Sequence, residues 1–91
     1  HRALVNGTTV ELTDREWLLA VYLLRNHGRL LTRQELLEKV WKTNPDIVTR
    51  TVDTHISRLR AKLALTPEHG FDLRTVYHRG YRLEYSAPSA A

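Results

Sequence analysis

The 91-residue chain contains no cysteine and no methionine. The lack of cysteine excludes disulfide bridges and thiolate metal sites, and it is compatible with a reducing compartment. No apolar run approaches the roughly 20 residues that a membrane-spanning helix needs, and no signal-peptide pattern is present. Because the first residue is His1 rather than methionine, we expect the chain to be a piece excised from a longer protein.

Charge is distributed unevenly along the chain. Residues 50–82 carry seven Lys or Arg against three Asp or Glu, whereas residues 1–49 carry seven against six, and the net charge is +4. A basic half in a small domain favours a polyanionic partner. On charge alone, a solvated basic face is an equally good alternative.

Strand and turn signals stand at both ends of the chain. Residues 3–12 predict two short strands around Asn-Gly, a pair that accepts the positive φ angles of a tight hairpin turn. Residues 73–77 and 81–85 alternate around a glycine-containing turn and predict a second hairpin. The small, polar tail, residues 86–91, is expected to be disordered.

Two capping boxes predict helix starts between these hairpins. Residues 13–16 and 32–35 both read Thr-x-x-Glu, in which the hydroxyl and the carboxylate satisfy free amides of the first turn. The first helix is expected to end near Asn26 and the second near Trp41. The side chains expected to face the core are Trp17, Leu18, Val21, Tyr22, Leu23, Leu24, Leu36, Leu37, Val40 and Trp41. A surface position is the alternative for Trp41.

A third helix, predicted over residues 49–64, has two clearly different faces. At about 100° per residue, one apolar seam forms from Val52, Ile56, Leu59 and Leu63. The opposite face holds small or polar side chains and arginines: Arg50, Thr54, Ser57, Arg58 and Ala61. Such a face fits a major groove about 12 Å wide, because it lacks bulk and arginine can bind guanine O6 and N7 together. The alternative is an amphipathic surface helix with a solvated basic side.

The second hairpin supports the nucleic-acid interpretation. Thr75, Tyr77 and Arg79 precede Gly80, so this turn could place a cation in a minor groove. A sheet that closes the core is the plainer interpretation, and the two are compatible.

The sequence shows no catalytic or metal-binding pattern. Asp53, His55 and Ser57 suggest a triad, but on a helix Asp53 points about 160° away from His55, so the two cannot form a relay. The histidines lack close ligand spacing; they are His1, His27, His55, His69 and His78. We therefore expect no enzyme activity, no cofactor and no metal.

Two linked motifs resemble the OmpR/PhoB-type winged-helix effector domain of bacterial two-component response regulators. Residues 50–62 read RTVDTHISRLRAK and residues 74–83 read RTVYHRGYRL, and residues 12–19 and 31–41 fit the same family in the same order. The resemblance implies an α+β winged helix-turn-helix: an N-terminal antiparallel sheet, three helices, and a C-terminal wing hairpin that pairs with residues 29–32. The domain would span residues 1–85, followed by the disordered tail at 86–91.

The resemblance also implies sequence-specific binding of double-stranded DNA for transcriptional regulation. The recognition helix, residues 49–64, would lie in the major groove, and the wing, residues 73–85, at the adjacent minor groove. The implied base contacts are Thr51, Asp53, Thr54 and Arg58. The implied backbone contacts are Trp41, Arg50, His55, Arg60 and Thr75, and the implied minor-groove residues of the wing are Tyr77 and Arg79.

The partners implied by the family go beyond DNA. The loop at residues 42–48 corresponds to the segment that touches RNA polymerase in activators. A receiver domain phosphorylated on aspartate by a histidine kinase would precede this domain in a cytoplasmic protein, without membrane contact by this domain. Two copies would bind tandem direct repeats.

The wing and the third helix depart from the family pattern at two places. Many members carry Arg-Gly-x-Gly after Thr-Val, whereas this chain has Tyr77 and His78 there, and we expect Arg79 to supply the cation instead. The position before Arg58 is often basic, but here it is Ser57.

A winged helix whose basic face binds an acidic protein is the alternative function.

Overall fold

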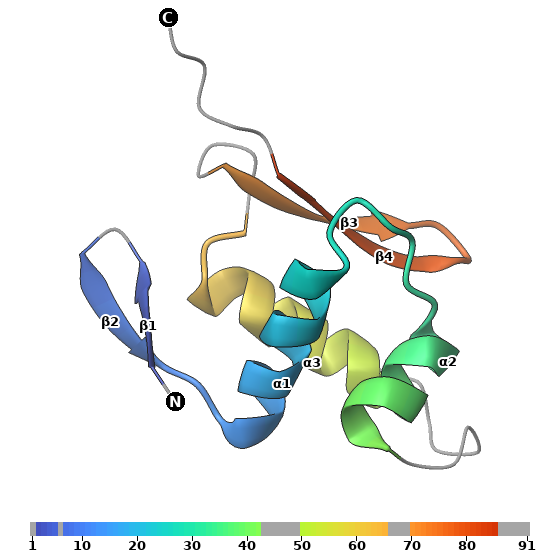
Figure 1. Cartoon of the computed structure of the whole chain (residues 1–91), viewed down its shortest axis with the longest axis horizontal. Helices are drawn as coiled ribbons and strands as arrows, with labels where there is room; N and C mark the ends of the chain where they lie inside the picture. The colour runs from blue at the N-terminus through green and yellow to red at the C-terminus, as the bar shows by residue number, and fades with distance from the viewer. Residues whose placement is uncertain (1, 6, 43–49, 66–69, 86–91) are drawn as a thin grey trace, which may run out of the picture.

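The structure is a computed structural model that describes residues 2–5, 7–42, 50–65 and 70–85. Its elements follow the order that the sequence predicts, strands, helices and a hairpin (Figure 1). They are β1 (Arg2–Val5), β2 (Thr8–Glu11), α1 (Asp14–Arg25), α2 (Arg33–Leu36), η1 (Leu37–Trp41), α3 (Arg50–Lys62), β3 (Phe71–Val76) and β4 (Gly80–Tyr85). Most of the predicted polymerase-binding loop and the whole predicted disordered tail lie outside the described residues.

Both predicted hairpins are present. β1 pairs antiparallel with β2, and β3 pairs antiparallel with β4 from Phe71–Tyr85 to Val76–Gly80. Leu31 also forms an isolated antiparallel bridge with Tyr81, in which each backbone amide donates to the other carbonyl, over 2.8 and 2.9 Å. This bridge confirms the predicted pairing between the wing and the segment before the second helix.

Helix α1 begins with the predicted capping box. The Thr13 hydroxyl accepts from the Glu16 amide over 3.2 Å, and the Glu16 carboxylate accepts from the Thr13 amide over 2.9 Å. Helix α2 begins in a similar way, with the Thr32 hydroxyl accepting from the Glu35 amide over 3.0 Å. These local bonds fix both helix starts because they satisfy amides that have no partner within the helix.

The predicted inward face of α1 is wrong for Trp17, Leu18 and Leu24, whereas Leu23 is buried as predicted and Val21 and Tyr22 are half-buried. The buried residues are Glu16, Leu19, Ala20 and Leu23. Trp17 is 36% exposed, Leu18 48% and Leu24 47%. Apolar residues occur on nearly every side of this helix, so periodicity alone offers two candidate faces. The face that is buried is the one whose first-turn Glu16 forms an ion pair with Lys62 of α3, over 2.7 Å.

The second helix changes its winding part of the way along. Leu36, Leu37 and Val40 are buried as predicted, and Trp41 is half-buried. Residues of η1 form a π-helical turn, which the sequence did not indicate, and the turn ends at Lys42 with a left-handed φ of 53°. Wider turns of this kind are often found near functional sites, and here the turn carries Trp41.

The core lies between the helices and the wing. It is made of Leu12, Leu19, Ala20, Leu23, Leu31, Leu36, Leu37, Val40, Val52, Ile56, Leu59, Leu73, Tyr81 and Leu83. The predicted seam of α3 is confirmed, with Leu63 partly buried at its end. Each such aliphatic side chain contributes about 1.5–3 kcal/mol by burial, so the seam holds the opposite face of α3 outward. No helix in the described ranges has the length and apolar character needed to cross a membrane.

Candidate nucleic-acid interface

The face of α3 opposite the buried seam is open to solvent. Its exposed residues are Arg50, Thr54, Ser57, Arg58 and Ala61. The Thr54 hydroxyl donates to the Arg50 carbonyl oxygen over 3.1 Å, which leaves its oxygen turned along the helix surface as an acceptor. No other described element covers Thr54 or Arg58, so both side chains are available to a partner.

Asp53 lies on one flank of this face and joins three elements. Its Oδ1 atom accepts from Arg33 Nε of α2 over 2.7 Å and from the Tyr81 hydroxyl of β4. The Arg33 guanidinium also lies over the Tyr81 ring, 5.1 Å from its centroid. Although Asp53 was predicted to contact a base, its carboxylate is engaged within the domain. That base contact stays a prediction.

The contacts of Asp53 shift two pKa values in opposite directions. Burial raises the pKa of the Asp53 carboxyl, but hydrogen bonds from Tyr81 and Arg33 outweigh it, so the net pKa lies below the ordinary value. Burial and the Asp53 carboxylate raise the pKa of the Tyr81 phenol. The cluster is therefore held in its ionised-carboxylate, neutral-phenol form around neutral pH.

Trp41 and His55, both predicted backbone contacts, touch each other on the other flank. Their ring centroids are 5.1 Å apart and nearly perpendicular, at 87°. Arg15 lies over the Trp41 ring at 5.5 Å and donates from Nη1 to the Val40 carbonyl oxygen over 2.5 Å. His55 Nδ1 is 2.9 Å from the Thr51 carbonyl oxygen. Because a carbonyl only accepts, the His55 proton sits on Nδ1 in the neutral ring.

Arg60 and Thr75, two further predicted backbone contacts, also lie side by side. Arg60 donates from Nη2 to the Thr75 hydroxyl over 3.2 Å and from Nε to the Leu73 carbonyl oxygen over 3.1 Å. These bonds fasten β3 against α3. Hydrogen bonds from Arg60 therefore join the wing strand directly to α3.

The turn between β3 and β4 carries the predicted wing residues. Tyr77 is 81% exposed, Arg79 is also exposed, and the Arg79 amide donates to the Val76 carbonyl oxygen over 2.9 Å. Gly80 follows with φ of 147°, where a Cβ atom would lie 2.1 Å from the Leu31 carbonyl oxygen. Only glycine allows this close approach, which sets the position of the wing against the segment before α2.

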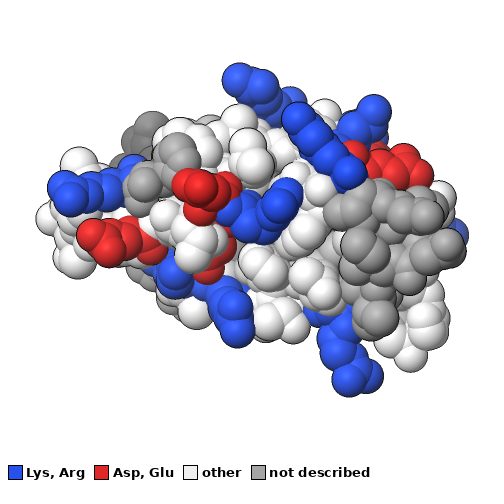
Figure 2. All heavy atoms as spheres, turned by 90° about the horizontal axis from the view of Figure 1, so that it is seen from below, with Lys and Arg blue, Asp and Glu red and all other residues white. Residues whose placement is uncertain are grey.

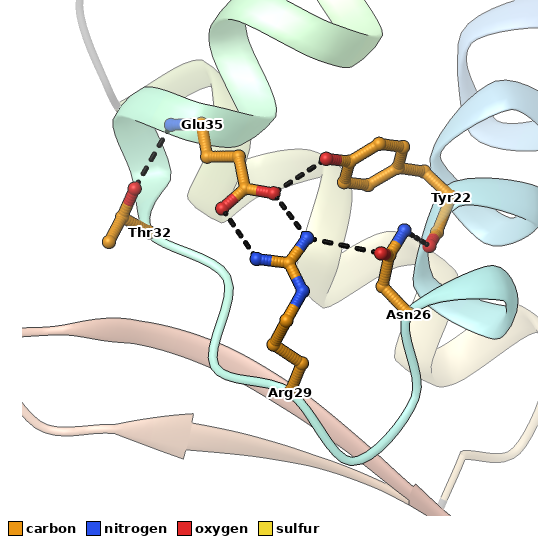
Figure 3. Close-up of polar contacts among 5 residues, drawn as sticks. All are labelled: Tyr22, Asn26, Arg29, Thr32 and Glu35. Carbon is orange, nitrogen blue, oxygen red and sulfur yellow. Dashed lines mark hydrogen bonds and ion pairs between the residues drawn. The ribbon is translucent and has the colours of Figure 1, made fainter.

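A polar network sets α2 relative to α1 (Figure 3). The Glu35 carboxylate accepts from the Tyr22 hydroxyl over 2.6 Å and from both terminal nitrogens of Arg29, over 2.6 and 3.2 Å. Arg29 also donates to the Asn26 side chain over 3.1 Å. The Arg29 hydrogen bond lowers the pKa of Glu35 despite its partial burial, and burial together with Glu35 raises the pKa of Tyr22.

Sequence reasoning missed Arg33, Tyr81 and Arg15 as members of the interface region. Arg33 stands directly after the capping Thr32, and Tyr81 directly after Gly80, but nothing in their spacing shows that both meet Asp53.

Figure 2 shows Lys and Arg spread over one face of the molecule with fewer Asp and Glu between them. Within the described residues, no group of three or more His, Cys, Asp or Glu could hold a metal ion.

Comparisons with known proteins agree with this geometry. Residues 7–83 match the family described as "Transcriptional regulatory protein, C terminal". The sensory transduction protein RegX3 of Mycobacterium tuberculosis is 43% identical over 84 residues, which cover 92% of this chain and 37% of that protein. This chain therefore spans little more than a third of that relative's length.

Two solved structures have the same fold. The DNA-binding domain of CpxR from E. coli has a TM-score of 0.78 and 30% identity, with 94% of this chain and 84% of that chain covered. The Klebsiella pneumoniae RstA DNA-binding domain, solved in complex with the RstA box, has a TM-score of 0.75 and 27% identity over 93% of this chain and 82% of that one. The chain thus belongs to the family of winged-helix DNA-binding effector domains of response regulators, which are transcriptional regulators and not enzymes.

Proposed function

We propose that this domain recognises a specific double-stranded DNA sequence by placing α3 in the major groove and the wing at the adjacent minor groove. The exposed face of α3 carries this proposal. It offers Thr54 and Arg58 to a partner while the opposite seam is buried, and its small side chains allow the helix to approach base edges.

Base recognition would fall to four residues of α3. Arg58 is the strongest candidate, because its planar guanidinium can bind guanine O6 and N7 together. Thr51 and Thr54 would contact bases through a hydroxyl or a methyl group. Asp53 would reach a base only by giving up its bond to Arg33 or Tyr81.

Contacts with the DNA backbone would come from two pairs that flank this face. Trp41 and His55 form one pair and Arg60 and Thr75 the other, and Arg50 adds a cation at the start of α3. Backbone contacts of this kind fix the register of a protein on the duplex without reading its sequence. The wing would add Tyr77 and Arg79 in the minor groove.

The remaining partners follow from the family and are proposals for the whole protein. A receiver domain controlled by a histidine kinase would accompany this domain in a cytoplasmic regulator. Two copies would bind tandem direct repeats, and the loop at residues 42–48 would touch RNA polymerase.

Selection of bound duplexes from a random DNA pool tests the proposal. A recurrent motif is expected, and the winning duplex is then titrated by fluorescence anisotropy at several salt concentrations. If about five phosphates are neutralised, log K falls against log salt with a slope near −4.5, roughly a several-hundred-fold loss between 50 and 200 mM. Failure to enrich any sequence, with no binding at low salt, would refute DNA recognition and favour an acidic protein partner.

A further inference from the structure

The tip of the wing contains a residue whose backbone conformation is unfavourable for its side chain. His78 has φ of 62°, in the left-handed region that residues other than glycine adopt uncommonly, although histidine does so more often than most. Glycine would adopt this conformation freely. The left-handed backbone at His78 therefore lowers the stability of the folded state relative to a glycine in the same place.

The side chain of His78 contributes little to the stability of the fold. His78 is exposed, and its ring contact is with Tyr77, itself 81% exposed, at 3.9 Å between centroids and 48° between planes. Neither ring belongs to the core or packs against it. A tilted ring pair this open to solvent buries little apolar area, so packing does not explain the left-handed φ of His78.

The location of the pair points to DNA. Tyr77 lies in the turn that directly follows β3, two residues after Thr75. Thr75 is bonded to Arg60 of the recognition helix. In Figure 1 the β3–β4 turn lies at the edge of the fold, clear of the three helices. The aromatic pair thus lies at the tip of a hairpin whose strand β3 is bonded to α3.

We infer that His78, supported by the ring of Tyr77, is a specificity-determining residue that reads the minor groove of A·T-rich duplex DNA. This inference rests on the proposed function and adds a residue to it. An imidazole N–H can donate to adenine N3 or thymine O2, whereas the guanine amino group would oppose it with a second donor. A·T-rich minor grooves are also narrow and strongly negative, which attracts histidine and arginine side chains.

The test compares His78→Gly with wild type and with Ala64→Gly. Ala64 also has a left-handed φ, of 50°, but lies after the end of α3, away from the wing tip, so it controls for relief of backbone strain. For His78→Gly we expect a Tm equal to wild type or a few degrees higher, together with an affinity for the selected duplex about fivefold to tenfold weaker. Ala64→Gly is expected to leave affinity unchanged.

A set of duplexes tests the minor-groove assignment directly. The A·T pairs under the wing are replaced by G·C, or by inosine·C, which presents a major groove like G·C but lacks the minor-groove amino group. Wild type is expected to bind inosine·C nearly as well as A·T and to bind G·C less well, and His78→Gly should lose this discrimination. Equal affinity of His78→Gly and wild type, discrimination that survives in the variant, or a lowered Tm would each overturn the inference. If wild type binds no duplex, the proposed function itself fails.

Discussion

Arg33 of α2 donates a hydrogen bond to Asp53 of α3 over 2.7 Å, so an ion pair joins the two helices of the helix-turn-helix. The same carboxylate oxygen accepts from Tyr81 of the wing. One side chain thus ties α3 both to α2 and to the wing strand β4. This places Asp53 in a bracing role, beside its predicted role as a base contact.

Asp53→Asn separates these two roles. If Asp53 mainly braces the interface, the variant should weaken binding to all DNA sequences alike. A double-mutant cycle with Arg33→Ala should give a coupling free energy of unfolding of about 1 kcal/mol, because solvent partly screens the ion pair. A base-reading role would instead change the preferred base at one position. Anisotropy titrations on single-base variants of the duplex, with urea unfolding, decide between them.

Acid should destabilise the domain through three carboxylates. Glu16, Glu35 and Asp53 have pKa values below their ordinary 4.5, 4.5 and 3.8 when folded. In Glu16 and Asp53 burial is the largest influence and acts upward, but hydrogen bonds from Lys62 and Thr13, or from Tyr81 and Arg33, outweigh it. In Glu35 the Arg29 hydrogen bond is largest and acts downward.

Because these folded pKa values are lowered, the carboxylates stabilise the domain fully above about pH 5, and the stabilisation is lost as pH falls through the folded values. Urea unfolding at pH 7, 5, 4 and 3 measures the loss. Glu35→Gln, which removes one titrating group, should give a shallower decline. A free energy of unfolding that stays constant from pH 5 to pH 3 would contradict the prediction.

Gly80→Ala should loosen the wing. The new Cβ atom would lie 2.1 Å from the Leu31 carbonyl oxygen, so the bridge between Leu31 and Tyr81 must open. We expect a loss of about 2–4 kcal/mol in the free energy of unfolding. Gly7→Ala is a useful control, because its Cβ would meet nothing within 4 Å although its φ is also positive, at 81°. A similar loss in both variants would show that φ alone, rather than the close approach, accounts for the effect.

Arg58→Ala and Arg60→Ala should affect DNA binding differently. Arg58 is exposed on the outward face, and its loss should cost about 1–3 kcal/mol on the selected duplex and relax base preference. Arg60→Ala should weaken matched and scrambled duplexes alike and reduce the salt slope by about one. Arg60→Lys keeps the charge but not the fork to Leu73 and Thr75, so it separates phosphate attraction from bracing. Identical effects of the two alanine variants on specificity would contradict this division.

The starts of the first two helices could be predicted from sequence because they depend on local contacts. Each Thr-x-x-Glu segment satisfies its own amides within one turn, and both N-caps are present at Thr13 and Thr32. The buried seam of α3 could also be predicted from the sequence, because its apolar residues are confined to one side of the helix. The same reasoning predicted the outward face that carries Thr54 and Arg58.

Tertiary packing decided what local pattern left open. Helix α1 is apolar on most sides, so its packing against η1, α3 and β4 selects Leu19, Ala20 and Leu23 over Trp17 and Leu24 for burial.

The sequence by itself thus determined the element order, the helix starts and the polar face of α3, since these arise from neighbours along the chain. Only the folded structure brought Arg33, Asp53 and Tyr81 together and placed His78 in a left-handed turn at the wing tip. Long-range contacts depend on how whole elements pack, and that packing is a property of the complete core rather than of any one segment.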